Sequence, residues 1–409
     1  DGTYFHSGLL AIRAAVAAGV NATYKILFND AVAMTGGQKH DGALTVPAAV
    51  AQIRAEGVRE VVVIAEQPEV WRGRLPDGLR VLHRDHLMAE QTRLRGLEGV
   101  TCIIYDQVCA AEKRRRRKRG QTPPPVAQVM INPEVCEGCG DCSVQSNCIA
   151  IEPLETGLGR KRRVNLAACN ADLSCLKGFC PSFVTIEGGR RRPARVPLPP
   201  AFDGEIPAPA AAIRDSHALL LAGIGGTGVI TVAAILAQAA HLDGLAVQAL
   251  NQTGLAQKNG AVMSHLRIAR DAGALHAPRI GRDEADAVLA FDTVAAAAPR
   301  ALASIAPGRS AVVADPHVTP TAAFLRNPGG DLRSGAALAQ LRRRAGAGLV
   351  TCDATALAQR HFGDPIAANI LLTGHAFQLG LVPVSEGALT RAITLNGGTV
   401  ARNLAAFRA

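Results

Sequence analysis

Seven of the ten cysteines in this 409-residue chain lie between Cys136 and Cys180, and this run constrains the fold more than any other feature of the sequence. It opens as C-x2-C-x2-C at Cys136, Cys139 and Cys142, and it closes at Cys180, directly before a proline. Three thiolates at this spacing can bind one face of an iron–sulfur cluster, and a distant Cys-Pro can complete the set. Zinc is the competing interpretation of any C-x2-C pair, but the triplet favours iron–sulfur. The segment therefore predicts electron transfer.

The other cysteines leave the number of clusters open. Two [4Fe–4S] clusters take eight thiolates, four each, and the run offers seven. One cluster is expected on the first three cysteines and the last. Most of a second is expected on the three that lie between them, Cys148, Cys169 and Cys175. Its fourth ligand comes from elsewhere or is absent, and Cys109 is a candidate by elimination. Cys102 and Cys352 stand in apolar, strand-like contexts that are typical of core thiols.

Composition divides the chain into three expected parts, residues 1–121, 122–197 and 198–409. In the first and third parts, apolar runs of strand character alternate with helical stretches, which predicts α/β folds on parallel sheets. The middle part has few long apolar runs, so we expect it to depend on inorganic clusters for order. The expected strands are 24–28, 60–65, 100–105, 218–222, 245–250, 287–291 and 310–314, and the expected helices of the first part are 9–18 and 47–56.

The net charge of +10 is unevenly distributed, because Lys113 to Arg119 are seven consecutive basic residues. Basic runs can bind nucleic acid, but this one holds no aromatic residue to stack on bases. With the prolines at 123–125, it is interpreted as a solvated linker or a docking face. An acidic electron carrier is a better candidate partner than nucleic acid, since charge attraction raises encounter rates.

Residues 218–237 carry no formal charge and are long enough to span a bilayer. Four glycines and two threonines interrupt them, which favours a strand, a glycine turn and a helix instead. The chain shows no secretory signal, and cysteines kept reduced for cluster ligation suit a cytoplasmic location. We therefore expect no membrane association.

The glycine turn Gly223–Gly228 resembles a dinucleotide-binding fingerprint, G-x-G-x-x-G, between a strand and a helix. A nicotinamide dinucleotide site also needs an acid at the end of the second strand, where this chain has Asn251. The alternative is that these glycines only permit close packing of the strand against the helix.

The amino-terminal residues carry a weaker pattern. Asp1-Gly2 is followed by the expected strand 24–28 and then by Asn29-Asp30. A carboxylate and an amide oxygen at neighbouring strand ends can both reach Mg²⁺, which holds diphosphates through such oxygens. The glycine-rich turn 34–38 can bring backbone amides close to a cofactor. Together these features predict a magnesium–diphosphate site.

These motifs together resemble indolepyruvate:ferredoxin oxidoreductases of the 2-oxoacid:ferredoxin oxidoreductase family. The resemblance extends over most of the chain, through residues 1–8, 28–38, 109–120, 136–183 and 253–257. It implies a fragment of a long fused chain. The three parts would be the carboxy-terminal part of a thiamine-diphosphate-binding domain, a ferredoxin-like iron–sulfur segment and a gamma-type, Rossmann-like domain.

The resemblance also implies residue roles. The thiamine diphosphate and magnesium site would comprise Asp1, Gly2, Asn29, Ala31, Thr35 and Gly36. Asp1, the Asn29 side chain and the Ala31 carbonyl would bind magnesium, and the others would line the thiamine. His6 is a candidate catalytic residue, although a lone histidine near a turn is more often structural. The loop 253–258 would lie near the active site or the acyl acceptor, and the family commonly has an acid where Asn251 stands.

The implied activity is oxidative decarboxylation of a 2-oxoacid, with indolepyruvate or another aryl pyruvate preferred. Coenzyme A would accept the acyl group and ferredoxin the electrons. A glutamate that activates thiamine would come from an upstream domain or a partner subunit, and the enzyme is expected to be a homo-oligomer. The alternative function is an electron-transfer subunit that has iron–sulfur clusters but no thiamine chemistry of its own.

Overall fold

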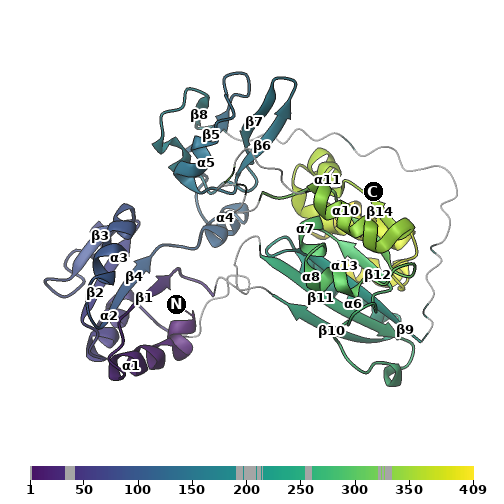
Figure 1. Cartoon of the computed structure of the whole chain (residues 1–409), viewed down its shortest axis with the longest axis horizontal. Coiled ribbons are helices and arrows are strands. Elements are labelled where there is room, and N and C mark those ends of the chain that lie inside the picture. Colours follow the sequence, from purple (N-terminus) through teal and green to yellow (C-terminus); the bar gives the residue numbers. More distant parts are fainter. Residues whose placement is uncertain are drawn as a thin grey trace. The chain divides into compact units, whose positions relative to one another are not determined.

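The computed structural model describes residues 2–32, 42–189, 215–253, 260–320 and 334–409, with single residues at 197, 209, 213, 324 and 327. It separates the chain into two compact units, Asp1–Pro125 and Val126–Ala409 (Figure 1). The division into three parts at 121/122 and 197/198 stays a prediction.

The first unit is an α/β fold on a parallel sheet. Its elements are α1 (Leu9–Ala17), β1 (Ala22–Phe28), α2 (Val46–Ala55), β2 (Glu60–Ala65), β3 (Arg80–His83), α3 (Leu87–Arg95), β4 (Val100–Asp106) and α4 (Ala110–Lys118). The strands pair in the order β1-β4-β2-β3, all parallel. Alternate residues of β2 face opposite sides, so Val63 packs with α1 and α2 while Ile64 packs with α3. The predicted strands and helices of this unit are confirmed, whereas β3 and α3 were not predicted.

Local sequence signals set the ends of α2. The Thr45 hydroxyl accepts a hydrogen bond from the Ala48 N–H at 3.2 Å, which caps the first turn. Pro47 occupies that turn, where its missing N–H costs nothing. The helix stops before Gly57, whose φ of 84° suits a residue without a Cβ.

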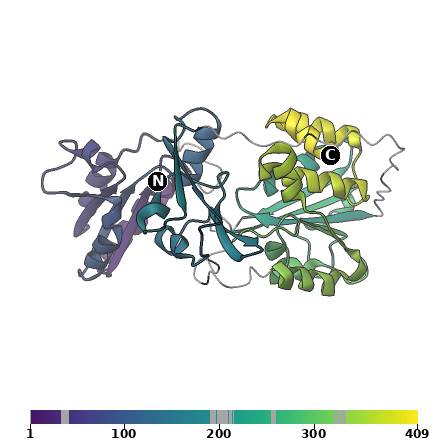
Figure 2. The ribbon, with the colours of Figure 1, turned by 90° about the horizontal axis from the view of Figure 1, so that it is seen from above.

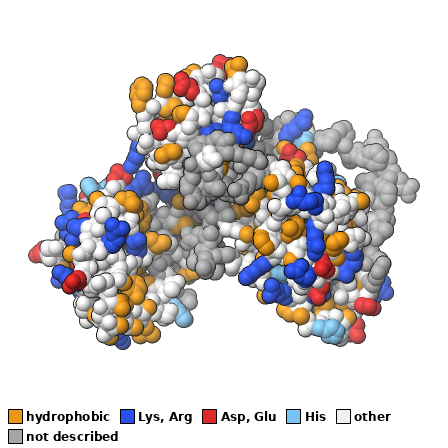
Figure 3. Space-filling view, in the orientation of Figure 1, with side chains coloured by type: hydrophobic (Ala, Val, Ile, Leu, Met, Phe, Trp, Pro, Cys, Tyr) orange, Lys and Arg blue, Asp and Glu red, His pale blue; other side chains and the backbone are white. Residues whose placement is uncertain are grey.

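The cysteine-containing part of the second unit consists of two short antiparallel ribbons and a helix. Its elements are β5 (Ala127–Ile131), α5 (Asp141–Ser146), β6 (Ile151–Thr156), β7 (Gly159–Val164) and β8 (Phe183–Glu187). Strand β5 pairs with β8, and β6 pairs with β7. Large apolar side chains remain exposed, among them Leu158 and Phe179, and Figure 3 shows apolar side chains on the surface of this part. Apolar burial is therefore limited here.

The rest of the second unit is a six-stranded sheet with helices on both faces (Figure 2). Its strands are β9 (Ser216–Ile224), β10 (Ala246–Gln252), β11 (Ala261–Ala269), β12 (Ala287–Ala290), β13 (Ala311–Ala314) and β14 (Leu349–Thr351). Its helices are α6 (Val229–Leu242), α7 (Thr293–Ala296), α8 (Pro299–Ser304), α10 (Ser334–Ala345), α11 (Ala354–Phe362), α12 (Ala368–Gln378), α13 (Glu386–Asn396) and α14 (Val400–Arg408). The strand order is β10-β11-β9-β12-β13-β14, and β9, β12, β13 and β14 are parallel.

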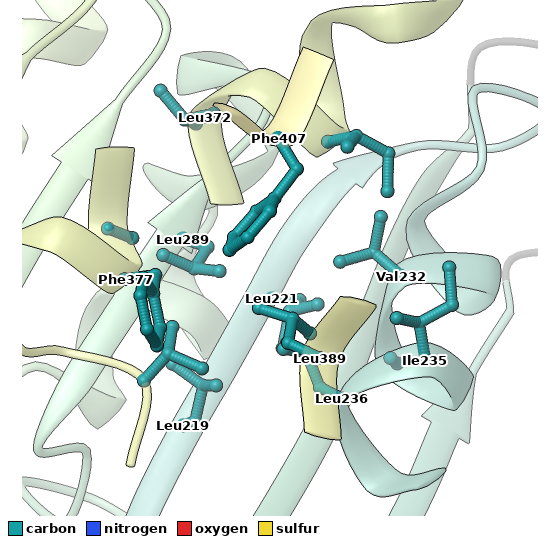
Figure 4. Close-up of a cluster of buried hydrophobic side chains, with 14 of the residues drawn as sticks. Leu219, Leu221, Val232, Ile235, Leu236, Leu289, Leu372, Phe377, Leu389 and Phe407 are labelled. Carbon is teal, nitrogen blue, oxygen red and sulfur yellow. The ribbon is translucent and has the colours of Figure 1, made fainter. Parts of the chain in front are cut away.

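One face of this sheet carries the largest core of the molecule. Leucines of β9 and β12 pack there against α6, α12, α13 and α14, as Figure 4 shows. The rings of Phe377 and Phe407 meet with centroids 5.5 Å apart and tilted by 58°, a favoured aromatic arrangement. Helix α14 lies so close to α12 that a Cβ on Gly374 would stand 2.3 Å from the Phe407 carbonyl oxygen.

One expectation for this region is confirmed and another changes. The uncharged residues 218–237 are divided between β9, a turn and α6, as the favoured interpretation predicted. In the described part of the chain, no helix has the length and apolar composition to cross a membrane. The sheet is also not wholly parallel, because the unpredicted β11 lies between β9 and β10 and is antiparallel to both.

Candidate functional site

The first cysteine group lies on a loop whose backbone requires glycine at two positions. Gly138 and Gly140 have φ of 75° and 83°. A Cβ on Gly138 would stand 2.1 Å from the Arg160 carbonyl oxygen, so the loop runs directly against β7. The Gly138 N–H points to the Cys136 sulfur at 3.4 Å. The residues between the cysteines thus fold the loop tightly and direct an amide hydrogen at a thiol.

The second group is brought together from three places in the chain. Burial, together with the nearby Cys148 and Cys169, raises the pKa of Cys175 to about 11. The Ala171 N–H donates to the Cys169 sulfur at 3.3 Å. Ala171 and Leu173 have φ of 53° and 59°, a left-handed conformation that is uncommon for such residues. A strained loop therefore carries Cys169 to its two neighbours.

The two groups share one small apolar cluster. Cys136 and Cys175 are buried in it beside Val129, Ile131 and Ile151, and Cys142 and Cys148 pack against it. Burial raises the pKa of Cys142, and the neighbouring Cys139 adds to the effect. The Cys180 sulfur lies 3.0 Å from the Ser182 hydroxyl. Four of the seven predicted ligands thus lie in or against one apolar cluster.

The other three cysteines lie outside that cluster. Cys102 is fully buried in β4, where burial raises its pKa to about 12, as a core thiol requires. Cys109 precedes α4 in the first unit, and its proposed role as a fourth ligand stays a prediction. Cys352 is half-buried after β14, and burial raises its pKa.

The donor set fits an iron–sulfur cluster in chemistry. None of the ten cysteines forms a disulfide. Within the described residues, no three His, Cys, Asp or Glu side chains gather closely enough to hold a single metal ion. A cluster, in contrast to zinc, spreads its thiolates over separate irons. Soft thiol donors, N–H···S contacts and an apolar surround are the features by which proteins bind and tune such clusters.

The two ends of the predicted magnesium–diphosphate motif lie next to each other. A Cβ on Gly2 would stand 2.9 Å from Cγ2 of Val32, so the amino-terminal residues contact the turn that follows β1. In that turn the Asn29 carbonyl accepts a hydrogen bond from the Cys109 N–H at 3.2 Å, and Ala31 is buried. Asp1, Thr35, Gly36 and the rest of 33–41 lie outside the described residues.

His6 is exposed on a π-helical turn, Tyr4–Gly8. A cavity of about 210 Å³ lies beside this turn and is lined by Tyr4, Phe5, Leu9, Ala43, Leu44, Ala48 and Gln52. The Tyr4 hydroxyl donates to the Gln52 side chain at 2.9 Å, and burial raises the Tyr4 pKa to about 12. The cavity is therefore mostly apolar, with one polar pair.

The basic run corrects a prediction. It is not a solvated linker, because residues 110–118 form α4 and several of its cations pair with acids. Lys113 contacts Glu66 at 3.0 Å, and Arg116 contacts Asp30 at 2.9 Å. Both acids stand just after parallel strands, so α4 lies at the carboxyl edge of the first sheet, the edge where α/β sheets bind ligands.

The glycine turn of the second sheet serves close packing at its first glycine. A Cβ on Gly223 would stand 2.7 Å from Val229 and 3.1 Å from Phe291. The Asn369 amide holds the turn by donating to the Thr227 carbonyl at 3.1 Å. On β10, Asn251 accepts a hydrogen bond from Ser264 of β11 at 2.7 Å, which gives it a local structural partner. Residues 254–258 of the predicted loop lie outside the described residues.

Two buried acids at the same sheet edge were not predicted. Asp292 follows β12 and accepts a hydrogen bond from the Ala295 N–H, and Asp315 follows β13 and accepts one from the Thr355 hydroxyl. Burial raises the pKa of both carboxyl groups. The signal in the sequence was an aspartate placed directly after each apolar strand.

Comparison with known proteins gives one family match. The profile of the family described as pyruvate ferredoxin/flavodoxin oxidoreductase matches residues 218–409. The indolepyruvate oxidoreductase subunit IorB of Archaeoglobus fulgidus is 36% identical over 74 residues, which is 18% of this chain and 35% of that protein. IorB of Methanothermobacter thermautotrophicus is 32% identical over 113 residues, 28% of this chain and 54% of that protein. The chain thus spans only about a third to a half of these curated relatives.

Solved structures show weaker likeness. The pyruvate oxidoreductase subunit PORC of Thermotoga maritima is 19% identical with a TM-score of 0.33, over 48% of this chain and 94% of that one. The 2-oxoglutarate:ferredoxin oxidoreductase of Magnetococcus marinus, with 2-oxoglutarate, coenzyme A and succinyl-CoA bound, is 22% identical with a TM-score of 0.36. The match covers 48% of this chain and 30% of that one. The gamma subunit of a keto/oxoacid ferredoxin oxidoreductase from Geobacter sulfurreducens is 21% identical with a TM-score of 0.32. The match covers 47% of this chain and 94% of that one.

Proposed function

Since residues 218–409 match the pyruvate ferredoxin/flavodoxin oxidoreductase family, we propose that this chain is a member of that family and takes part in the oxidative decarboxylation of a 2-oxoacid. Its electrons would pass to ferredoxin and its acyl group to coenzyme A. The family match carries this proposal, and the grouped cysteines that precede the matched residues support it. Indolepyruvate or another aryl pyruvate is the proposed substrate, supported by the similarity to two IorB subunits.

The cysteine segment is proposed to bind one or two [4Fe–4S] clusters. The first would be held by Cys136, Cys139, Cys142 and Cys180, and a second by Cys148, Cys169 and Cys175. When bound, such clusters supply one-electron transfer. The protein would supply the amide hydrogens that point to Cys136 and Cys169, and the apolar residues that limit water around the thiols.

The first unit is proposed to bind thiamine diphosphate and magnesium at the turn after β1. Asp1, Asn29 and the Ala31 carbonyl would bind the metal, and Gly2, Thr35 and Gly36 would line the cofactor. The contact of Gly2 with Val32 supports this assignment, because it brings both ends of the motif to one place. His6 is proposed as a catalytic neighbour. Thiamine supplies an electron sink for decarboxylation when bound.

The proposed partners follow from that chemistry. Thiamine needs a glutamate to activate its aminopyrimidine ring, which we assign to an upstream domain or a partner subunit. We also propose a homo-oligomer with no nucleic-acid partner and no membrane contact, in the cytoplasm. Ferredoxin would receive the electrons.

The test uses the intact enzyme. Addition of a 2-oxoacid and coenzyme A should reduce the clusters, as electron paramagnetic resonance would show, and the reduction should require thiamine diphosphate and Mg²⁺. Asp1→Ala should abolish it, while Asp77→Ala, a change in an exposed turn, should not. A cluster-containing protein whose reduction needs no thiamine, and tolerates Asp1→Ala, would instead be an electron-transfer subunit.

A further inference from the structure

Arg116 links the basic helix α4 to the turn that follows β1. Its guanidinium contacts the Asp30 carboxylate at 2.9 Å and donates to the Asp30 backbone carbonyl at 3.3 Å. The same guanidinium contacts the buried Glu112 at 3.3 Å, and Arg115 contacts Glu112 at 2.9 Å. The Arg116 side chain is only 23% exposed. An anchored guanidinium therefore holds both the side chain and the backbone of one turn residue.

The residue that Arg116 holds has an unusual backbone conformation. Asp30 has φ of 59°, in the left-handed region that aspartate tolerates better than most residues. On the strand side, the chain is fixed by the Gln107 N–H to the Phe28 carbonyl at 3.1 Å and by the Cys109 N–H to the Asn29 carbonyl. After Asn29, the described contacts of the turn include the ion pair and the hydrogen bond that Arg116 makes with Asp30.

The Asp30 carboxylate is 61% exposed and lies between two proposed magnesium-binding residues, Asn29 and Ala31. Such a carboxylate can compete for a divalent cation. Its ion pair with Arg116 opposes that competition, because the guanidinium already neutralises the charge. The same ion pair fixes the position of Asp30 in the turn after β1.

We infer that Arg116 is a positioning residue, which orients the turn Asn29–Ala31 for a magnesium–diphosphate ligand without touching that ligand. This inference rests on the proposed thiamine function. It assigns a role to the basic run that the proposed activity leaves unexplained. Residues behind metal ligands commonly change metal affinity by about 10- to 100-fold when they are replaced.

The chain provides a matched control on the same helix. Lys113 contacts Glu66 at 3.0 and 3.3 Å, at the carboxyl end of β2. Lys113→Gln and Arg116→Gln each remove one cation from α4. The first removes the ion pair with Glu66, and the second removes the ion pairs with Asp30 and Glu112. In the described contacts Arg116 bonds to the turn after β1 and Lys113 to Glu66, so the comparison separates positioning from general electrostatics.

The experiment measures binding of Mg²⁺ and thiamine diphosphate to the intact enzyme by equilibrium dialysis. Arg116→Gln should weaken binding about 10-fold or more, and Arg116→Lys should restore part of it because the charge remains. Asp30→Asn, which keeps a residue that tolerates the left-handed conformation, should weaken binding by less. Lys113→Gln should stay within about twofold of the wild type. Iron content should be the same in all four variants.

The outcomes are distinguishable. If Arg116→Gln binds as tightly as Lys113→Gln, or if Asp30→Asn and Arg116→Lys both bind like the wild type, the positioning role is wrong while the thiamine function stands. If the wild-type enzyme itself binds no thiamine diphosphate with Mg²⁺, the proposed function fails, and this inference fails with it.

Discussion

The cysteine segment, 126–189, and the carboxy-terminal sheet, 215–409, bury different kinds of side chain. The sheet buries leucines such as Leu221 and Leu236 in a core that joins β9 to α6 and α12–α14. The segment buries three aliphatic side chains together with Cys136 and Cys175, and leaves Phe179 96% exposed. Apolar area supplies most of the free energy of folding for a domain. The sheet is therefore stabilised by its own side chains, whereas the proposed clusters would supply stability to the segment.

The strongest test of this comparison is removal of iron. Chelation under reducing conditions should cause residues 126–189 to lose most of their amide protection, because binding energy at such sites is folding energy. Residues 215–409 should keep their protection. Hydrogen exchange followed by mass spectrometry measures both regions in one sample.

Metal analysis provides the control for that test. The native protein should hold about four irons per chain for one cluster or about eight for two, with matching sulfide. Cys139→Ser should lower the iron content, while Cys352→Ser, outside the apolar cluster of the segment, should not. Full protection of 126–189 in iron-free protein would show that the segment is stable without clusters.

A smaller effect is expected from tightening the core of the sheet. Gly223→Ala places a methyl group 2.7 Å from Val229 and 3.1 Å from Phe291, so β9 and α6 must separate. Overpacking of this kind lowers the free energy of unfolding by about 1–3 kcal/mol, which urea titration would measure. Gly335→Ala, in α10 where a Cβ meets nothing within 4 Å, should instead be neutral or slightly stabilising. Equal effects at both sites would contradict the close packing of β9 on α6.

The smallest effect concerns a polar group in the same sheet. Burial, with Arg279 and Arg267 nearby, lowers the pKa of His265 from its usual 6.5 to about 4. Between these values the unfolded chain binds a proton that the folded chain does not, so stability falls as the pH is lowered through this window. The loss at pH 5 should be about 1–2 kcal/mol relative to pH 7.

His265→Gln should remove that acid dependence, because glutamine does not titrate in this range and can still accept the hydrogen bond that Ile280 donates to the ring at 3.2 Å. Urea midpoints at pH 5 and pH 7, taken for both proteins, give the difference. An unchanged difference between the proteins at the two pH values would mean that His265 is not held neutral.

Much of the fold followed from local pattern. The strand at 60–65 was predicted at its observed bounds, because five consecutive apolar residues between charged neighbours are typical of a buried strand. Pro47 and Gly57 likewise marked the ends of α2, whereas the Thr45 cap was seen only in the structure. Strand β11 was missed. Its place between β9 and β10, antiparallel to both, is also not shown by its sequence. Strand order depends on distant contacts, which local pattern does not contain.

The candidate site divided in the same way. The C-x2-C-x2-C spacing indicated the first cysteine group because its three thiols are local in sequence. Cys148, Cys169 and Cys175 were expected to hold most of a second cluster, and the structure brings Cys148 and Cys169 near Cys175, with left-handed residues in the loop after Cys169. The basic run was misinterpreted, since its acidic partners, Glu66 and Asp30, precede it by tens of residues.

The sequence alone determined many of the strands and helices and the first cysteine group, because propensity, capping and spacing act over a few residues. Only the tertiary structure decided that Arg116 reaches Asp30 and that Gly223 must lack a side chain. These relations depend on contacts between parts that are distant in the chain. Such contacts form only when helices and strands pack together, so neither sequence segment shows them by itself.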